Sequence, residues 1–401
     1  MRWILLPTSG SRPSQAGTSE SRLFAIGSIP WRLHRKQLTS YVSARQSLEA
    51  SLTLIQPNGV FLLCLLVFCL GDQSPGRAPV AERNSGQVGS PPPPGRLIDL
   101  GGYRLHLNCV GTRPGSVTVV LSAGAGDFST DWSLVQPEVS KFTRVCSYDR
   151  SGAAWSDLGP KPRTMIQEAF DVRRLLLLAG ERGPYLLVGQ SLGGMIMRVF
   201  QERYPQDVAG IVLVDAYSED SQLGINGKLE RVRLQAKRRQ IPGPRTSVEE
   251  SDQLTPTERA QIREFIDKYV GTPKIEPPFE KLPENAQRDR IWALGQLTYY
   301  ASDDDYLAEI SAKMYAEDQN KRFSLGSIPL IVLTRTKYDY PPALRATLTK
   351  EHQEQQARMA KLSTRGRQIL VPNSGHHIQI DAPAAVVNAI RALFETVANK
   401  H

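Results

Sequence analysis

The chain has 401 residues, of which 40% are hydrophobic and 22% are charged, so it can bury a full core. This composition excludes a disordered polyampholyte and a protein with many membrane spans. The formal net charge is +9, and residues 1–59, with seven basic and two acidic side chains, hold more than half of it. The remaining charge forms no basic stripe interleaved with aromatic residues, so we expect no nucleic-acid partner.

An apolar run of eleven residues, VFLLCLLVFCL, lies at 60–70. It is shorter than the roughly 20 residues of a membrane-spanning helix and has the length of the hydrophobic part of a signal peptide. The basic segment 1–59 precedes it, and a proline-rich linker, 71–96, follows it. We therefore expect export or membrane association through residues 60–70. The alternative, a buried element of the main domain, would make the protein cytoplasmic.

From residue 97 short apolar runs alternate with amphipathic stretches, a pattern typical of an α/β fold with a mostly parallel sheet and helices on both faces. The sequence predicts a core made of residues 97–216 and 327–401. We expect eight strands, the first two forming a hairpin across Gly101-Gly102: Ile98–Leu100, Tyr103–Val110, Val117–Ser122, Arg144–Tyr148, Tyr185–Gly189, Ile211–Asp215, Leu330–Thr334 and Gln368–Val371. The apolar spacing from Met165 to Ala179 predicts a helix.

The strand pattern stops between residues 217 and 326, where charged helical sequence replaces it. Thr255-Pro256-Thr257-Glu258 is a capping box with proline at the first helical position, and it predicts a helix that ends before Gly271. A helical segment inserted between two strands of one sheet would lie over the strand ends. We therefore expect residues 217–326 to form a helical cap, or lid.

A possible nucleophile lies at the end of the fifth predicted strand, in Gly189-Gln190-Ser191-Leu192-Gly193. The order of strand, G-x-S-x-G turn and helix is that of a nucleophile elbow. Glycines are needed there because the serine takes a strained backbone angle and its neighbours approach closely. The sequence thus predicts Ser191 as a nucleophile at the tip of the turn.

A serine hydroxyl needs a base and an orienting acid. Among the six histidines, His376 directly follows a predicted strand, so we expect it to be the base, with His377 packing beside it. The others lie in less suitable places: His34 near the start of the chain, His106 in the edge hairpin, His352 on a helix rich in lysine and glutamate, and His401 at the end.

Two aspartates are candidates for the acid that orients the histidine. Asp339 lies in the loop after the predicted strand Leu330–Thr334, and Asp215 ends the predicted strand Ile211–Asp215. We favour Asp339, with Asp215 as the alternative. The chain order serine, aspartate, histidine is the one expected for this type of triad.

Stabilisation of an oxyanion requires two fixed backbone N–H groups. The first is expected from Leu192, directly after the nucleophile. The second is expected from Ala125, in the small-residue loop Ser122–Gly126, with Gly124 as the alternative.

Cofactor and metal motifs are missing from the sequence. It contains no H-E-x-x-H, no CxxC pair, no G-x-G-x-x-G and no P-loop lysine. The prediction is therefore no cofactor and no metal. Of the four cysteines, Cys109 and Cys146 lie in two predicted strands, where we expect them to be buried free thiols, with a disulfide between them as the alternative.

Several motifs in order resemble those of the α/β-hydrolase fold-1 group of bacterial serine hydrolases. The match covers roughly residues 95 to 398 and rests on FTRVCSYDRSGAAWSD, YLLVGQSLGGMIMRVFQERYP, AGIVLVDA, IPLIVLTR and SGHHIQIDAP. The resemblance implies the α/β-hydrolase fold with a cap over the site. It also implies nucleophile, base and acid at Ser191, His376 and Asp339, and oxyanion donors at Leu192 and Ala125.

The sequence departs from the usual pattern at three places. Ala123-Gly124 replaces the usual His-Gly pair, Gln190 stands where many members have histidine, and Arg335-Thr336-Lys337 replaces the usual glycine-containing approach to the acid.

These features together predict a serine hydrolase that cleaves an ester-like bond of a small-molecule substrate through an acyl-enzyme. Hydrolysis of a lactone, an amide or a carbon–carbon bond, and perhydrolysis, are related alternatives, because the cap sets the substrate. A different class of function is a non-catalytic ligand-binding or receptor protein on the same fold. No feature of the sequence predicts an oligomeric state.

Overall fold

The computed structural model describes residues 90–113, 117–219, 222–225, 228–231, 241–301, 324–339 and 342–398. The apolar run 60–70, the basic segment 1–59 and most of the linker 71–96 lie outside them, and so do His34 and His401. Within the described ranges, no helix combines the length and the apolar character that crossing a membrane requires.

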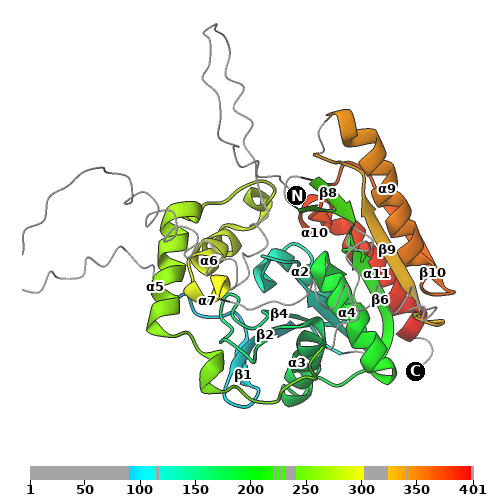
Figure 1. The fold of residues 1–401 in the computed structure, drawn as a ribbon. Coiled ribbons are helices and arrows are strands. Elements are labelled where there is room, and N and C mark those ends of the chain that lie inside the picture. The colour runs from blue at the N-terminus through cyan, green and yellow to red at the C-terminus, as the bar shows by residue number, and fades with distance from the viewer. Residues whose placement is uncertain are drawn as a thin grey trace, which may run out of the picture. The chain divides into compact units, whose positions relative to one another are not determined.

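The core is an eight-stranded, mostly parallel sheet with the order β1-β2-β4-β3-β5-β6-β9-β10 (Figure 1). The six strands from β4 to β10 are parallel, and the hairpin β1–β2 adds two antiparallel strands at one edge. The bounds are β1 Arg96–Asp99, β2 Arg104–Val110, β3 Thr118–Ser122, β4 Arg144–Tyr148, β5 Tyr185–Gln190, β6 Val208–Val214, β9 Leu330–Arg335 and β10 Gly366–Val371. The predicted α/β fold is confirmed, with strand ends shifted by up to three residues.

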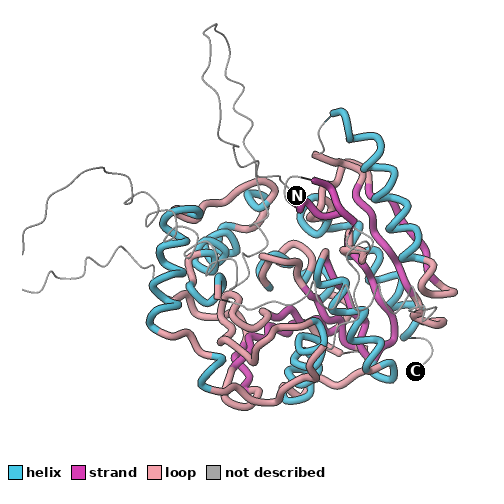
Figure 2. Tube along the Cα trace, in the orientation of Figure 1, coloured by secondary structure: helices cyan, strands magenta, loops and turns pink. Residues whose placement is uncertain are grey.

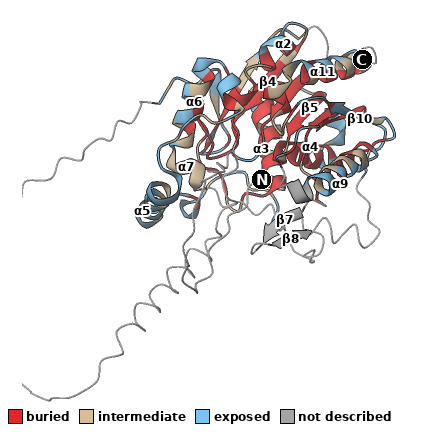
Figure 3. Ribbon diagram, turned by 90° about the horizontal axis from the view of Figure 1, so that it is seen from above, coloured by how far each residue is buried: buried red, intermediate tan, exposed pale blue. Residues whose placement is uncertain are grey.

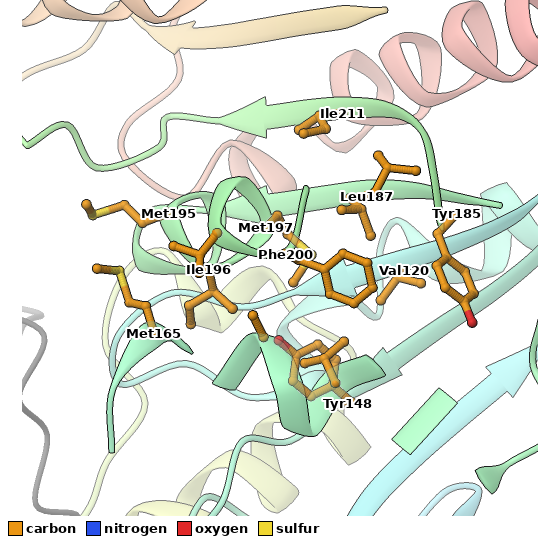
Figure 4. Packing of buried hydrophobic residues seen from close by; sticks show 14 of the residues in the cluster. Val120, Tyr148, Met165, Tyr185, Leu187, Met195, Ile196, Met197, Phe200 and Ile211 are labelled. Atoms are coloured by element: carbon orange, nitrogen blue, oxygen red, sulfur yellow. The ribbon is translucent and has the colours of Figure 1, made fainter. Parts of the chain in front are cut away.

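Helices cover both faces of the sheet because its central strands are apolar on both sides. In β5, Leu187 packs on one face, while Leu186 and Val188 pack on the other. The helices α3 (Met165–Leu178), α4 (Leu192–Arg203) and the end of α9 (Pro342–Ala360) cover the first face, and α2 (Gln136–Ser140) and α11 (Pro383–Ala398) cover the second. The central strands β3 and β5 are accordingly buried along their whole length, unlike the edge strands β1 and β10 (Figure 3). In the first of these cores, Phe200 of α4 lies beside Leu187 and Val120, and Met195 of the same helix belongs to the same cluster (Figure 4).

The described residues between β6 and β9 form several helices, as the sequence predicted for the segment 217–326 (Figure 2). The capping box of Thr255 and Glu258 is present at the start of α5. An antiparallel hairpin, β7–β8, was not expected from the sequence. The elements are β7 Gln222–Ile225, β8 Lys228–Arg231, η4 Glu250–Asp252, α5 Pro256–Phe265, η5 Ile266–Val270, η6 Phe279–Lys281, α6 Glu284–Leu294 and α7 Leu297–Tyr300.

Three short helices complete the described fold: η1 Ser129–Trp132, η2 Pro205–Asp207 and α10 Ile378–Asp381. Cys109 of β2 and Cys146 of β4 face each other in the strand register and are joined as a disulfide. The expectation of free thiols is therefore wrong, and the alternative holds because the register places the two side chains directly opposite each other on neighbouring strands.

Candidate active site

Ser191 lies in a sharp turn between the end of β5 and the start of α4. Its backbone angles are φ 51° and ψ −120°, a conformation that non-glycine residues rarely adopt outside functional sites. A Cβ on Gly193 would lie 2.4 Å from the carbonyl oxygen of Ser122, so only glycine fits there. The elbow predicted from the sequence is therefore present, with a half-buried serine at its tip.

The strand register brings His376 and Asp215 to the edge of the sheet where the elbow lies. The N–H of Ser191 donates to the carbonyl oxygen of Val214 at 3.2 Å, and Asp215 directly follows Val214. The carboxylate of Asp215 accepts a hydrogen bond from Nδ1 of His376 at 2.6 Å. The side-chain amide of Gln190, next to Ser191, donates to the carbonyl oxygen of His376 at 3.3 Å. Three segments distant in the sequence thus meet at one point.

The prediction that Asp339 is the partner of His376 is wrong, because Asp215, the alternative, occupies that place. The chain after β9 turns Tyr338 inward, where its hydroxyl donates to the carbonyl oxygen of Arg335 at 2.9 Å. Asp339, the next residue, is exposed. In the loop after β9, a buried tyrosine therefore takes the inward position that the sequence analysis expected for the acid.

Asp215 is fully buried and surrounded by hydrogen-bond donors. Its Oδ1 accepts from Nε2 of His352 at 2.9 Å and from the backbone N–H of Arg335 at 3.2 Å, and the Arg335 guanidinium lies 3.5 Å from Oδ2. Burial alone raises the pKa of this carboxyl group. The charges of Arg335 and His352 and the hydrogen bonds of both histidines outweigh burial and hold the pKa well below the usual value. Asp215 is therefore ionised at neutral pH.

The imidazole of His376 is neutral at pH 7. Loss of water around the ring lowers the pKa of His376 to about 4, although the hydrogen bond and the charge of Asp215 oppose this shift. An ionised carboxylate only accepts, so Nδ1 of His376 carries the proton and Nε2 keeps its lone pair. This is the tautomer that a general base requires.

The loop after β3 lies directly against the elbow. A Cβ on Gly124 would lie 3.1 Å from Cβ of Ser191 and 2.1 Å from Oε1 of Gln190, so glycine is required there. The N–H of Asp127 donates to the carbonyl oxygen of Gly124 at 3.2 Å, which closes a tight turn whose corner is Ala125. Backbone N–H groups can therefore approach the serine closely.

Arg150, which the sequence analysis did not single out, fixes this loop. Its buried guanidinium donates to the carbonyl oxygens of Ala123 and Gly124, both at 2.5 Å. The residue lies two positions after the end of β4. Its place in the motif FTRVCSYDRSGAAWSD, close behind a predicted strand, was the signal that could have found it. Arg150 thus braces the loop that leads to Ala125.

A buried charged cluster joins α6 to the same loop. Arg290 of α6 forms ion pairs with Asp131 and, at 3.3 Å, with Asp127. His377 lies 3.3 Å from Asp127, and its ring packs edge-on against Phe279 at 4.7 Å. The expected packing role of His377 thus involves a polar contact as well.

The pKa values of the two carboxyl groups in this cluster shift in opposite directions, although burial raises both. Burial raises the pKa of Asp131 to about 6, although Arg290 opposes the shift. Burial also raises the pKa of Asp127, but the charges of His377 and Arg290 outweigh it and lower the pKa below the usual value. The cluster therefore depends on the arginine that α6 supplies.

The histidine in the edge hairpin is not available for catalysis. His106 is completely buried, with Nδ1 on the carboxylate of Asp149 at 2.7 Å and Nε2 on the carbonyl oxygen of Pro94 at 2.5 Å. Both ring nitrogens therefore already have partners. His352, which the sequence analysis set aside because its predicted helix is rich in lysine and glutamate, is a neighbour of Asp215.

One group of potential metal-ligand atoms occurs among the described residues, at Cys109, Cys146 and Glu181. The two sulfur atoms are joined in the disulfide, and Glu181 forms an ion pair with Arg144 at 2.6 Å. The two sulfur atoms are therefore bonded to each other, and the carboxylate is paired with the arginine.

The sequence model of the alpha/beta hydrolase family matches residues 119–389, more than half of the chain. The chain belongs to this family. It is similar to a probable transporter, efuK, of Hormonema carpetanum, with 26% identity over 306 residues, 75% of this chain and 42% of that protein. It is also similar to a putative carbamate hydrolase, RutD, of Cronobacter sakazakii, with 29% identity over 105 residues, 26% of this chain and 39% of that protein. The chain spans less than half the length of these curated relatives.

The chain is also similar to solved structures. A putative epoxide hydrolase from Pseudomonas aeruginosa, solved as a mutant, matches with a TM-score of 0.50 and 15% identity, covering 75% of this chain and 95% of that one. A thermophilic esterase from Thermogutta terrifontis matches with a TM-score of 0.49 and 20% identity, covering 76% of this chain and 98% of that one. At 15% identity, the match to the putative epoxide hydrolase concerns the fold alone.

Replacing Arg290 by methionine is expected to destabilise the protein by about 3–5 kcal/mol, because two buried carboxyl groups lose their cation. Urea unfolding at pH 7 measures this change. Arg288→Met is the matched control: Arg288 is exposed on the same helix, and its loss should cost at most about 0.5 kcal/mol. Equal stability of the two variants would contradict the role of the buried cluster.

Proposed function

We propose that the protein is a serine hydrolase that cleaves ester-like acyl bonds of small molecules. Ser191 is the nucleophile, His376 the general base and Asp215 the acid that orients the base. The observation that carries this proposal is the 2.6 Å hydrogen bond between His376 and Asp215, at the edge of the sheet where the strained elbow holds Ser191.

The reaction proceeds in two halves. Oγ of Ser191 attacks the carbonyl carbon of the substrate while Nε2 of His376 takes the hydroxyl proton, and the tetrahedral oxyanion then expels the leaving group, which receives that proton. His376 next takes a proton from water, which attacks the carbonyl carbon of the acyl-enzyme. The second tetrahedral intermediate collapses by breaking its bond to Oγ of Ser191, which receives that proton from Nε2 of His376 as the acid is released. Asp215 stabilises the imidazolium ion that forms in both halves without itself becoming protonated.

The oxyanion is stabilised by backbone N–H groups of Leu192 and Ala125. Leu192 opens α4, so its N–H has no partner within the helix and adds to the positive end of the helix dipole. Ala125 belongs to the tight turn that Arg150 fixes against the elbow. Donors held in advance in this way contribute roughly 100- to 1000-fold each to the rate.

Labelling by a fluorophosphonate probe tests the enzyme class. The wild-type protein is expected to react covalently at Ser191 and to hydrolyse p-nitrophenyl esters in a series of increasing acyl length. Ser191→Ala should lose both activities. A folded wild-type protein that neither reacts nor hydrolyses these esters would instead favour a ligand-binding protein on the same fold.

Exchanging the two candidate acids for asparagine separates their roles. Asp215→Asn is expected to lower kcat by about 10⁴-fold, because asparagine can hold the imidazole in the wrong tautomer. Asp339→Asn should stay close to the wild-type kcat, since Asp339 is exposed. Steady-state kinetics on the best p-nitrophenyl ester measures both. A larger loss at residue 339 would restore the sequence-based assignment.

The pH profile reports the state of the base. Because the pKa of His376 is lowered to about 4, kcat/KM should be flat from pH 7 down to about 5 and fall as His376 becomes protonated near pH 4. The measurement is kcat/KM between pH 3.5 and 8 on an uncharged ester. Half-maximal activity near the ordinary histidine value of about 6.5 would contradict the expected environment of the ring.

A further inference from the structure

The carboxylate of Asp215 has a second histidine partner that the reaction does not use. We propose that His352, on α9, is a positioning residue of the triad: it fixes the plane of the Asp215 carboxylate so that Oδ2 faces His376. This inference rests on the proposed function and adds a third side chain to the pair of His376 and Asp215.

The need for such a residue follows from the geometry of aspartate. The bond that turns the carboxylate has broad, roughly two-fold preferences, so one hydrogen bond to Oδ2 leaves the group free to rock. A donor on the other oxygen removes this freedom. Nε2 of His352 provides it at 2.9 Å from Oδ1, and the N–H of Arg335 adds a longer contact at 3.2 Å.

A second contact, one helical turn after His352, fixes helix α9 against the chain that follows β6. Gln356 follows His352 by four residues and so lies on the same face of the helix. Its side-chain amide is buried and donates to the carbonyl oxygen of Ala216 at 2.7 Å. The helix therefore contacts Asp215 and the next residue with two successive turns, which fixes the exit from β6 from the α9 side.

The loop after β9 supports the ring of His352. Tyr338 packs edge-on against it, with ring centres 5.5 Å apart, and the Arg335 guanidinium lies 4.9 Å from the centre of the Tyr338 ring. The side chain of His352 is only 15% exposed. Arg335, which contacts Asp215 directly, thus also packs against the tyrosine that supports His352.

The two side chains beside Asp215 differ in chemistry, and the histidine is the one suited to orienting the carboxylate. Arg335 supplies a positive charge close to the buried Asp215, whereas a histidine N–H fixes the direction of one oxygen. A fixed carboxylate keeps the proton on Nδ1 of His376 and holds the ring toward the elbow. Loss of the fixing donor should thus weaken transition-state stabilisation and leave substrate binding unchanged.

The test compares variants of the full chain on p-nitrophenyl butyrate. His352→Ala is expected to lower kcat about 10-fold, the size expected for one hydrogen bond to a charged group, with KM nearly unchanged. His352→Gln should recover most of kcat, because its terminal amide can present a donor where Nε2 stood. Glu354→Ala, an exposed change on the same helix, is the control and should match the wild type.

A wild-type kcat in His352→Ala, or a loss that His352→Gln does not restore although both variants keep the wild-type urea unfolding midpoint, would overturn the positioning role. If the alanine variant does not fold, the comparison of His352→Gln with His352→Asn takes its place. Asparagine keeps the amide but is too short to reach, so equal kcat values for the two would also overturn it. Ser191→Ala distinguishes a failure of the proposed function from a failure of the role of His352. Full activity in Ser191→Ala refutes the proposed function. An inactive Ser191→Ala together with a fully active His352→Ala refutes only the role of His352.

Discussion

The proposed chemistry depends on one buried interaction, the hydrogen bond between the Asp215 carboxylate and Nδ1 of His376. Taking a carboxylate out of water is costly unless donors and charge replace the water. Two histidines and Arg335 replace it here, and they keep Asp215 ionised within the core. An ionised acid gives His376 one tautomer and one orientation. The hydroxyl of Ser191 can serve as a nucleophile only beside such a ring.

The parallel sheet explains why these groups meet although they are far apart in the sequence. The elbow follows β5, Asp215 follows β6, Arg335 ends β9, and His376 follows β10, so all lie at the carboxyl ends of neighbouring strands. The short loops there are fixed from several sides: Arg150 holds the carbonyl groups after β3, and α9 contacts the chain after β6. The positioning contacts therefore belong to the same packing that stabilises the sheet.

The sequence predicted the parts of the site that local patterns encode. The elbow required glycines around a serine between a strand and a helix, and His376 directly followed a strand, so both could be found by position. The acid could not be found by position, because two aspartates followed two strands. The choice between them depends on which aspartate the folded chain turns inward. Tyr338 takes the inward place after β9, a packing outcome without a local signal. The roles of His352 and Arg290 were not predicted for the same reason. Each residue lies on a helix rich in charged residues, and its partner is far away in the sequence.

A crystal structure of the protein after reaction with a fluorophosphonate tests the central claim most directly. The account predicts phosphorus bonded to Oγ of Ser191, the phosphonyl oxygen within hydrogen-bond distance of the backbone N–H groups of Leu192 and Ala125, and His376 still bonded through Nδ1 to Asp215. Phosphorus on another residue, or a His376 ring that points away from the adduct and has left Asp215, would contradict it.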